Sequence, residues 1–248
     1  MATNEFVRLS QSLGLPYGWE RIAWRWRQDR WRRMLAILYW MAQDGVSTTV
    51  ELRQRAGIDP GAMAKIVYSL QQGIPDSLVE VVNLRSGLLS LNIINLTPLG
   101  KELGAALRGV PVVESDWEKL VRLHRAEEQL KHAALVLFAA YQARLRGWRA
   151  EVVPFNPQET PWFQPDLIVT DLSGTAYSVE VETHTWANPK KWATKRNVNL
   201  VVQYPIQRQK MAAAFRKAGL PGRATDLKTL ARAAAGGDLS QFWLDMWS

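Results

Sequence analysis

The chain has 248 residues, of which 47% are hydrophobic and 22% charged, so its composition excludes wholesale disorder and its length suits one or two globular domains. Lysine and arginine number 31 against 23 aspartates and glutamates, an excess that favours a polyanionic partner, although a solvated basic surface gives the same count. The absence of cysteine excludes disulfides and thiolate-held zinc or iron–sulfur centres. Any metal must therefore be held by oxygen or imidazole.

Residues 1–30 are predicted to form a lead rich in arginine and tryptophan. The segment 19–45 predicts one long helix or two abutting helices, with an aromatic stripe on one face and arginines on the others. One interpretation is that the stripe packs in a core or at a domain interface, with arginine side chains extended over it. The other is that the arginines contact phosphates, and the two interpretations are compatible because the residues occupy different faces. No secretion signal and no apolar run of ~18 residues is visible, so we expect a cytoplasmic protein without a membrane partner.

Three helices are predicted at the start of the segment 31–110. The first ends at Gly45, and the second covers 47–57 behind a serine or threonine cap. In the third, Asp59 is an N-cap and Pro60 the first helical residue. The three helices follow one another with short connections.

Two alternating apolar runs, 77–84 and 88–96, follow these helices and predict a hairpin turning at a glycine. Thr97 and Pro98 then begin a closing helix. Helix, helix, helix, hairpin and helix is the order of winged helix-turn-helix domains, which this segment resembles down to its closing LTPLGKEL. The resemblance implies that the third helix enters the major groove and that the hairpin contacts backbone.

The winged-helix resemblance leaves two functions open, because such domains bind either DNA or other proteins. The third helix offers one cation, and neighbouring arginines would anchor phosphates. The candidate nucleic-acid contacts in this domain are Arg53, Arg55, Lys65, Ser69 and Arg85.

A second domain is predicted over 116–248, after a stretch without clear period at 108–118. A long helical pattern over 116–147 comes first. Helix and strand patterns then alternate in the order expected for a small mixed sheet flanked by helices. The strand patterns are 148–155, 163–174, 175–184 and 198–204, with helical patterns around 188–197 and over 206–219.

Three acids fall on these strand patterns. Asp166 follows Pro165 at the start of one strand, and Glu180 and Glu182 are two residues apart on the next, hence on one face. If the two strands pair as a hairpin, three carboxylates gather around one point and repel, a conflict that a divalent cation such as Mg²⁺ resolves. The alternative is a solvent-facing strand edge, where glutamates are ordinary.

The spacing P-D at 165–166 and E-x-E at 180–182 resembles the PD-(D/E)xK nuclease superfamily. The whole chain resembles the replication-relaxation family of plasmid and mobile-element proteins, which join a winged helix to a PD-(D/E)xK-like domain. The matching pieces are LTPLGKEL, the helix containing His132, QPDLIV, VEVETHT and LVVQYPIQRQKM. The resemblance implies an α/β (α+β) fold, a DNA partner and a DNA endonuclease site whose chemistry is Mg²⁺- or Mn²⁺-dependent hydrolysis.

In that scheme Asp166 and Glu180 hold the metal ion, while Glu182 positions water or a second ion. The superfamily pattern ends its third strand with lysine, where this chain has Glu182. Lys191 or Lys195, four residues apart, would supply the missing cation; alternatively they form a solvated basic helix face. Lys190 and Arg196 are further candidate nucleic-acid contacts.

Two histidines accompany the acids. His184 lies two residues past Glu182 and is the better candidate for a metal or phosphate neighbour. His132 either faces the acidic cluster or is a satisfied buried histidine. The aromatic tail, with Phe242, Trp243 and Trp247, is expected to dock on the second domain or on a neighbouring subunit.

Two functions therefore stay open. The first is a DNA-binding protein of a plasmid or mobile element with an active endonuclease site. The second is a non-catalytic replication or relaxosome accessory factor, or a transcription regulator, whose nuclease fold is inactive and serves as a DNA or protein binding module. Other replication or mobile-element proteins and a second copy of the chain are further possible partners.

Overall fold

The computed structural model describes residues 28–72, 77–86, 89–152, 164–192 and 197–248. The chain divides into two compact units, Met1–Glu118 and Lys119–Ser248, and the division falls within helix α7 (Asp116–His124). The architecture is mixed α/β, as expected. The predicted lead lies almost wholly outside the described residues. None of the helices in the described ranges is long and apolar enough to span a membrane.

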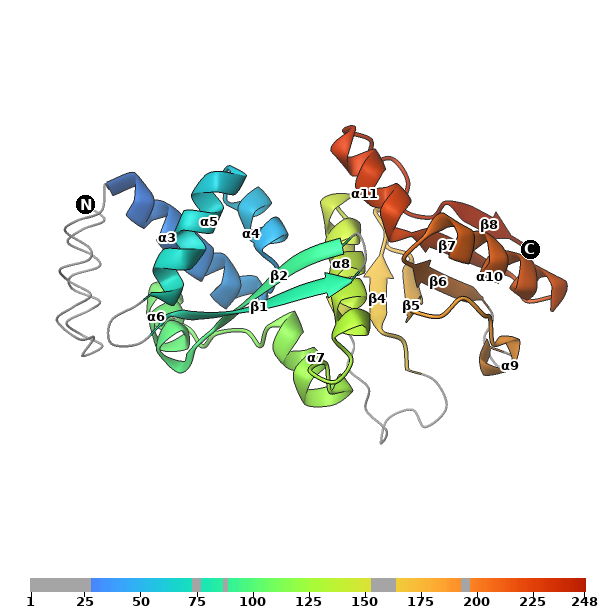
Figure 1. Ribbon diagram of the computed structural model, residues 1–248, viewed down its shortest axis with the longest axis horizontal. Helices are drawn as coiled ribbons and strands as arrows, with labels where there is room; N and C mark the ends of the chain where they lie inside the picture. Colours follow the sequence, from blue (N-terminus) through green and yellow to red (C-terminus); the bar gives the residue numbers. More distant parts are fainter. Residues whose placement is uncertain (1–27, 73–76, 87–88, 153–163, 193–196) are drawn as a thin grey trace. The chain divides into compact units, whose positions relative to one another are not determined.

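The first unit holds helices and one two-stranded hairpin, in the predicted order (Figure 1). Its elements are α3 (Gln28–Asp44), α4 (Thr49–Arg55), α5 (Pro60–Gln71), β1 (Val79–Ser86), β2 (Leu89–Leu96) and α6 (Pro98–Arg108).

Side-chain caps set the start of three of these helices. The Thr48 hydroxyl accepts the Glu51 N–H at 3.3 Å at the start of α4. The Asp59 carboxylate accepts the Ala62 N–H at 2.8 Å, and Pro60 begins α5. Thr97 caps α6 in the same way. Each cap satisfies an N–H that the helix leaves without an internal partner, which is why the sequence alone placed these boundaries.

The hairpin and the helices bury one shared core. β1 and β2 pair antiparallel from Val79 opposite Leu96 to Ser86 opposite Leu89. Gly100 in α6 lies so close to β1 that a Cβ would stand 2.0 Å from the Leu78 carbonyl oxygen. The core contains Met34, Ile37, Leu38, Leu52, Ile66, Leu70, Leu78, Ile94 and Leu103.

The second unit is a six-stranded mixed sheet with helices on both faces (Figure 1). Its elements are α8 (Leu130–Leu145), β3 (Arg149–Val152), β4 (Leu167–Thr170), β5 (Ala176–Glu182), α9 (Pro189–Trp192), β6 (Val198–Val202), α10 (Pro205–Lys217), β7 (Gly222–Asp226), α11 (Leu227–Ala235) and β8 (Asp245–Trp247).

The strand order is β3-β4-β5-β6-β7-β8, with parallel pairing for β5-β6 and β6-β7 and antiparallel pairing elsewhere. The predicted hairpin of β4 and β5 is thus confirmed. α8 packs against β3, β4 and β5, and α10 packs against β6, β7 and β8. Leu200 and Val202 of β6 share a core with Phe215 of α10, so the face that these two residues occupy is the α10 face.

Two expectations are corrected. The helical pattern over 116–147 is broken: α7 ends at His124, Arg125 takes a left-handed φ of 49°, and α8 begins at Leu130. The turn buries Ala126, and no glycine or proline marks it in the sequence. The C-terminal tail also contributes two strands, β7 and β8, which were not expected.

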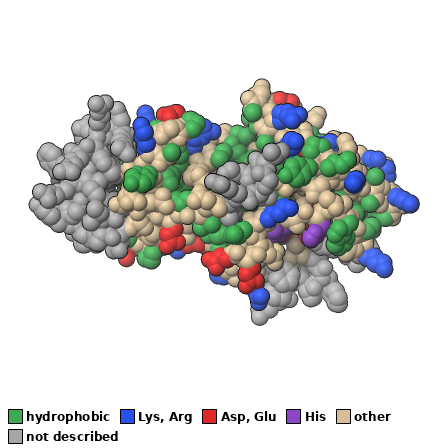
Figure 2. Space-filling view, viewed as in Figure 1, with side chains coloured by type: hydrophobic (Ala, Val, Ile, Leu, Met, Phe, Trp, Pro, Cys, Tyr) green, Lys and Arg blue, Asp and Glu red, His purple; other side chains and the backbone are tan. Residues whose placement is uncertain are grey.

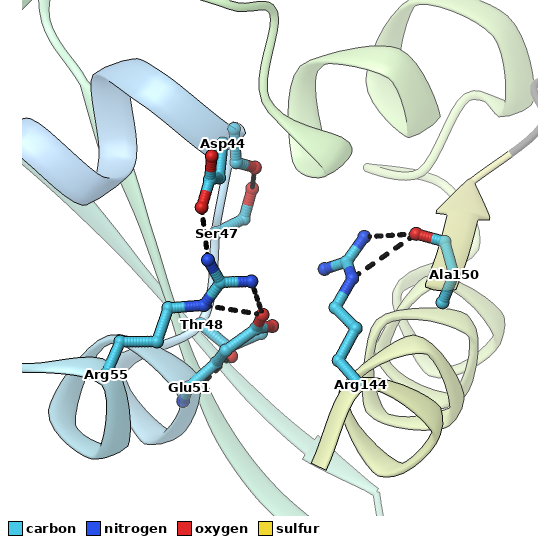
Figure 3. A network of polar contacts seen from close by, with 8 residues as sticks. Asp44, Ser47, Thr48, Glu51, Arg55, Arg144 and Ala150 are labelled. Carbon is cyan, nitrogen blue, oxygen red and sulfur yellow. Dashed lines mark hydrogen bonds and ion pairs between the residues drawn. The ribbon is translucent and has the colours of Figure 1, made fainter. Parts of the chain in front are cut away.

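Side-chain contacts tie α8 to β3 and the C-terminal tail to the rest of the second unit. Arg144 donates from Nη2 to the Ala150 carbonyl at 2.8 Å, which joins α8 to β3 (Figure 3). Phe242 packs against Trp148 with ring centroids 5.0 Å apart and planes tilted at 40°, and Trp243 is buried beside it. The expectation that the aromatic tail docks on the second domain is confirmed.

Candidate functional site

The start of β4 places Asp166 in the sheet. Leu167 pairs with Val179, so the register extended by two residues sets Pro165 opposite Val181. Proline has no N–H to donate, and the backbone ladder stops there. Asp166, only 4% exposed, supplies a side-chain acceptor in place of a strand carbonyl: its Oδ2 accepts the Val181 N–H at 2.7 Å. A buried acid is thereby fixed at the point where the strand pairing ends.

His132 of α8 completes this arrangement. Its Nε2 lies 3.1 Å from the Val181 carbonyl oxygen and 3.3 Å from Asp166 Oδ2. Because a carbonyl oxygen only accepts hydrogen bonds, Nε2 carries the hydrogen. Burial lowers the pKa of His132, but the hydrogen bond and charge of Asp166 outweigh burial and leave that pKa raised above its ordinary value. Of the two readings of His132, the structure favours the one that faces the acids.

Glu182 ends β5 beside Asp166. Its pKa is raised, first by burial and next by the negative charge of Asp166, while His184 and His132 offset part of the rise. The two carboxylates therefore repel each other. Glu180 pairs with Leu200 and Glu182 with Val202, so both glutamates lie on the α10 face, as the period-two spacing predicts.

The acids fit a divalent cation as a pair. In the described part of the chain, no group of three or more acidic, histidine or cysteine side chains is arranged to hold a metal ion. Mg²⁺, however, is commonly held by one or two carboxylates, with water and substrate phosphate as its other ligands. The repulsion between Asp166 and Glu182 is what a cation would relieve. Carboxylate oxygens are ligands that suit Mg²⁺ or Mn²⁺. With only two of them, water and phosphate would complete the coordination shell.

Known proteins give no relative for this site. No family model matches the chain, and no similar curated protein or solved structure was found. The candidate site therefore rests on the residues of the chain itself.

The candidate cations of the second unit lie next to β5 in the sequence. Lys190 is exposed on α9. Lys191 lies on the same short helix, although its side chain is not among those described. Lys195 and Arg196 lie outside the described residues. Figure 2 shows histidine side chains at the surface of this unit, with hydrophobic and basic side chains around them.

The nucleic-acid candidates of the first unit have different surroundings. Lys65 is exposed on α5. Ser69 is only 9% exposed, and its hydroxyl donates to the Lys65 backbone carbonyl at 2.8 Å, so Ser69 is a poor base contact. Arg53 lines a hollow of about 410 Å³ between α4, α5 and the hairpin. Arg85 lies on β1, but its side chain is not among those described.

Arg55 is held by two acids. Its Nη2 donates to Glu51 Oε1 at 2.8 Å, and its Nη1 bonds Asp44 (Figure 3). Its guanidinium also stands 5.7 Å from the centre of the Trp40 ring. Glu51 is buried, so this network closes α3 onto α4. Arg55 is a structural residue of the first unit, and a phosphate would have to compete with both carboxylates for it.

Trp186, two residues past the predicted candidate His184, was not expected to belong to the site. Trp186 is 61% exposed, and its ring stacks on His184 with centroids 5.5 Å apart and planes at 25°. Gln207 of α10 holds this segment, because its Nε2 donates to the His184 carbonyl at 3.2 Å. The tryptophan in the polar run THTWANPKK was the available signal.

Proposed function

We propose that this protein binds DNA and hydrolyses its phosphodiester bonds with Mg²⁺ or Mn²⁺, as a member of the replication-relaxation family of plasmid and mobile-element proteins. The observation that carries the proposal is the pair Asp166 and Glu182 at the open end of the β4–β5 hairpin. The Val181 N–H fixes Asp166, and the pKa of Glu182 beside it is raised. Perturbed carboxylates at a strand end are typical of catalytic sites.

The element order supports the same proposal. α3, α4, α5, the β1–β2 hairpin and α6 follow the order of a winged helix-turn-helix domain, with α5 as the recognition helix. A helix, three antiparallel strands and a parallel strand, from α8 to β6, follow the order of a PD-(D/E)xK core. The excess of 31 basic over 23 acidic residues favours a polyanionic substrate.

Each residue has a role in the proposed reaction. Asp166 and Glu182 would hold the metal ion, and Glu180 lies on the same sheet face as Glu182. A bound divalent ion neutralises phosphate charge and lowers the pKa of a coordinated water molecule. His132 keeps Asp166 oriented and stabilises its negative charge. Hydrolysis adds the water oxygen to phosphorus and breaks one P–O ester bond, and the departing oxygen leaves with a proton. Lys190, exposed on the neighbouring helix, is a candidate for holding the phosphate.

A nicking assay tests the proposal. Supercoiled and branched DNA are incubated with the protein and Mg²⁺ or Mn²⁺, and nicked product is measured for wild type, Asp166→Asn and Asp171→Asn. Asp171 lies at the other end of β4 and is the matched control. We expect nicking by wild type and the control, and at least about a hundredfold less by Asp166→Asn. No nicking by wild type, or equal nicking by all three, contradicts the enzyme proposal.

One observation favours a second function, a non-catalytic DNA-binding replication or relaxosome factor. Asp166 Oδ2 is already bonded by the Val181 N–H and lies next to His132, and no three-ligand group occurs in the described ranges. This alternative predicts DNA affinity that survives both chelation and Asp166→Ala, without nicking. Under either function the binding constant should fall with rising salt, as it does when phosphates are contacted.

A further inference from the structure

An exposed aromatic pair lies immediately after the candidate acids. Among the tryptophans whose side chains the structure describes, only Trp186 is exposed, with 61% of its surface accessible. Tryptophan is enriched at binding interfaces, where its large ring buries much area and its face is available for stacking. Its ring stacks on the His184 ring, with centroids 5.5 Å apart and planes at 25°, so the imidazole supports one face of the indole.

This surface is held in place rather than left on a loose loop. Gln207 is 5% exposed; its Nε2 donates to the His184 carbonyl at 3.2 Å, and its Oε1 accepts the Tyr204 N–H at 3.0 Å. One buried amide therefore joins the His184 backbone to the first turn of α10. A platform fixed before binding loses little conformational entropy when a ligand stacks on it.

The platform is close to the acids. His184 is two residues from Glu182 along the chain, directly after the end of β5. On the other side of Trp186 the chain continues into α9, which carries the exposed Lys190. Along the chain, aromatic rings are thus followed by a basic side chain, an order that suits a nucleotide with its base on the rings and its phosphate near Lys190.

We propose that Trp186 and His184 form a stacking platform for an unpaired nucleobase, so that the protein acts on DNA with single-stranded or unstacked nucleotides rather than on intact duplex. The inference rests on the proposed function, because it names the substrate class of the same site. A base inside a duplex has both faces covered by its neighbours, whereas an unpaired base has a free face for the indole.

Binding without metal tests this inference. Fluorescence anisotropy in chelator is measured with three labelled DNAs: a blunt duplex, the same duplex with a short unpaired tail, and a tailed duplex whose tail lacks bases. The variants are Trp186→Ala and Trp186→Phe, with Leu172→Ala as the matched control, since Leu172 is a 79% exposed apolar residue of the same unit.

We expect Trp186→Ala to bind the tailed duplex about tenfold more weakly than wild type, the size typical of one aromatic–base stack. Trp186→Phe and Leu172→Ala should bind it like wild type, and no variant should change affinity for the blunt or base-less DNA. Wild-type affinity of Trp186→Ala for the tailed duplex, or an equal loss on all three DNAs, overturns the inference. Because no metal is present, these results are independent of nicking, which Asp166→Asn tests separately.

Discussion

Asp166 can be probed by two substitutions that separate its structural and electrostatic roles. Asp166→Ala removes the acceptor of the Val181 N–H, whose 2.7 Å bond lies in the interior. A buried donor left without an acceptor costs about 1–3 kcal/mol of unfolding free energy. Asp166→Asn keeps an oxygen acceptor but loses the charge, so we expect a cost of about 1 kcal/mol or less. Urea unfolding followed by circular dichroism measures both.

The same substitution changes the neighbouring titrations. The charge of Asp166 raises the pKa of both His132 and Glu182. Asp166→Asn should therefore lower both pKa values, which NMR titration of the His132 ring and the Glu182 carboxyl detects. Asp171→Asn, at the far end of β4, should change neither.

The raised pKa of His132 has a defined consequence for stability. A group that binds its proton more tightly in the folded state stabilises the fold below its unfolded pKa, about 6.5 for histidine, and loses that contribution as pH rises through the folded pKa. The raised pKa of Glu182 acts with the same sign at lower pH. The stability advantage of wild type over Asp166→Asn should thus be larger at about pH 5.5 than at about pH 8.5. A pH-independent difference, or an unchanged His132 pKa in Asp166→Asn, would refute the His132–Asp166 contact.

Three further predictions concern the stability and local contacts of the two units. Gly100→Ala should destabilise the first unit by about 1–3 kcal/mol, because the new Cβ meets the Leu78 carbonyl oxygen, whereas Gly61→Ala in the first turn of α5 should be neutral or stabilising; thermal unfolding compares the two. Asp226 is a fully buried carboxylate that caps α11 and pairs with Arg208. Asp226→Ala should therefore lower the unfolding free energy of the second unit, measured in urea, by about 3–5 kcal/mol. A loss below about 1 kcal/mol would contradict the pairing. The hydroxyl of Ser173 is the main cause that lowers the pKa of Asp171 to about 2, so Ser173→Ala should raise that pKa toward its ordinary value in an NMR titration.

Local chemistry explains why most elements could be predicted from the sequence. Thr48, Asp59 and Thr97 cap helices with their own side chains, and such bonds depend only on neighbours within three residues. The hairpin of the first unit and the β4–β5 pair follow from period-two patterns. The shared face of Glu180 and Glu182 follows from the same period, so this part of the candidate site was contained in the sequence.

The tertiary structure decided what depends on residues far apart in the chain. The strand β8 has three residues, Asp245–Trp247, and forms because β7 offers it an edge. The turn at Arg125 follows from burial of Ala126, not from a local breaker. Most important for function, His132 and Asp166 meet at Val181 because Pro165 cannot continue the ladder and α8 packs over the strands. Capping and periodicity are local and can be read along the chain, whereas a contact between an α8 histidine and a β4 acid exists only once the sheet has formed.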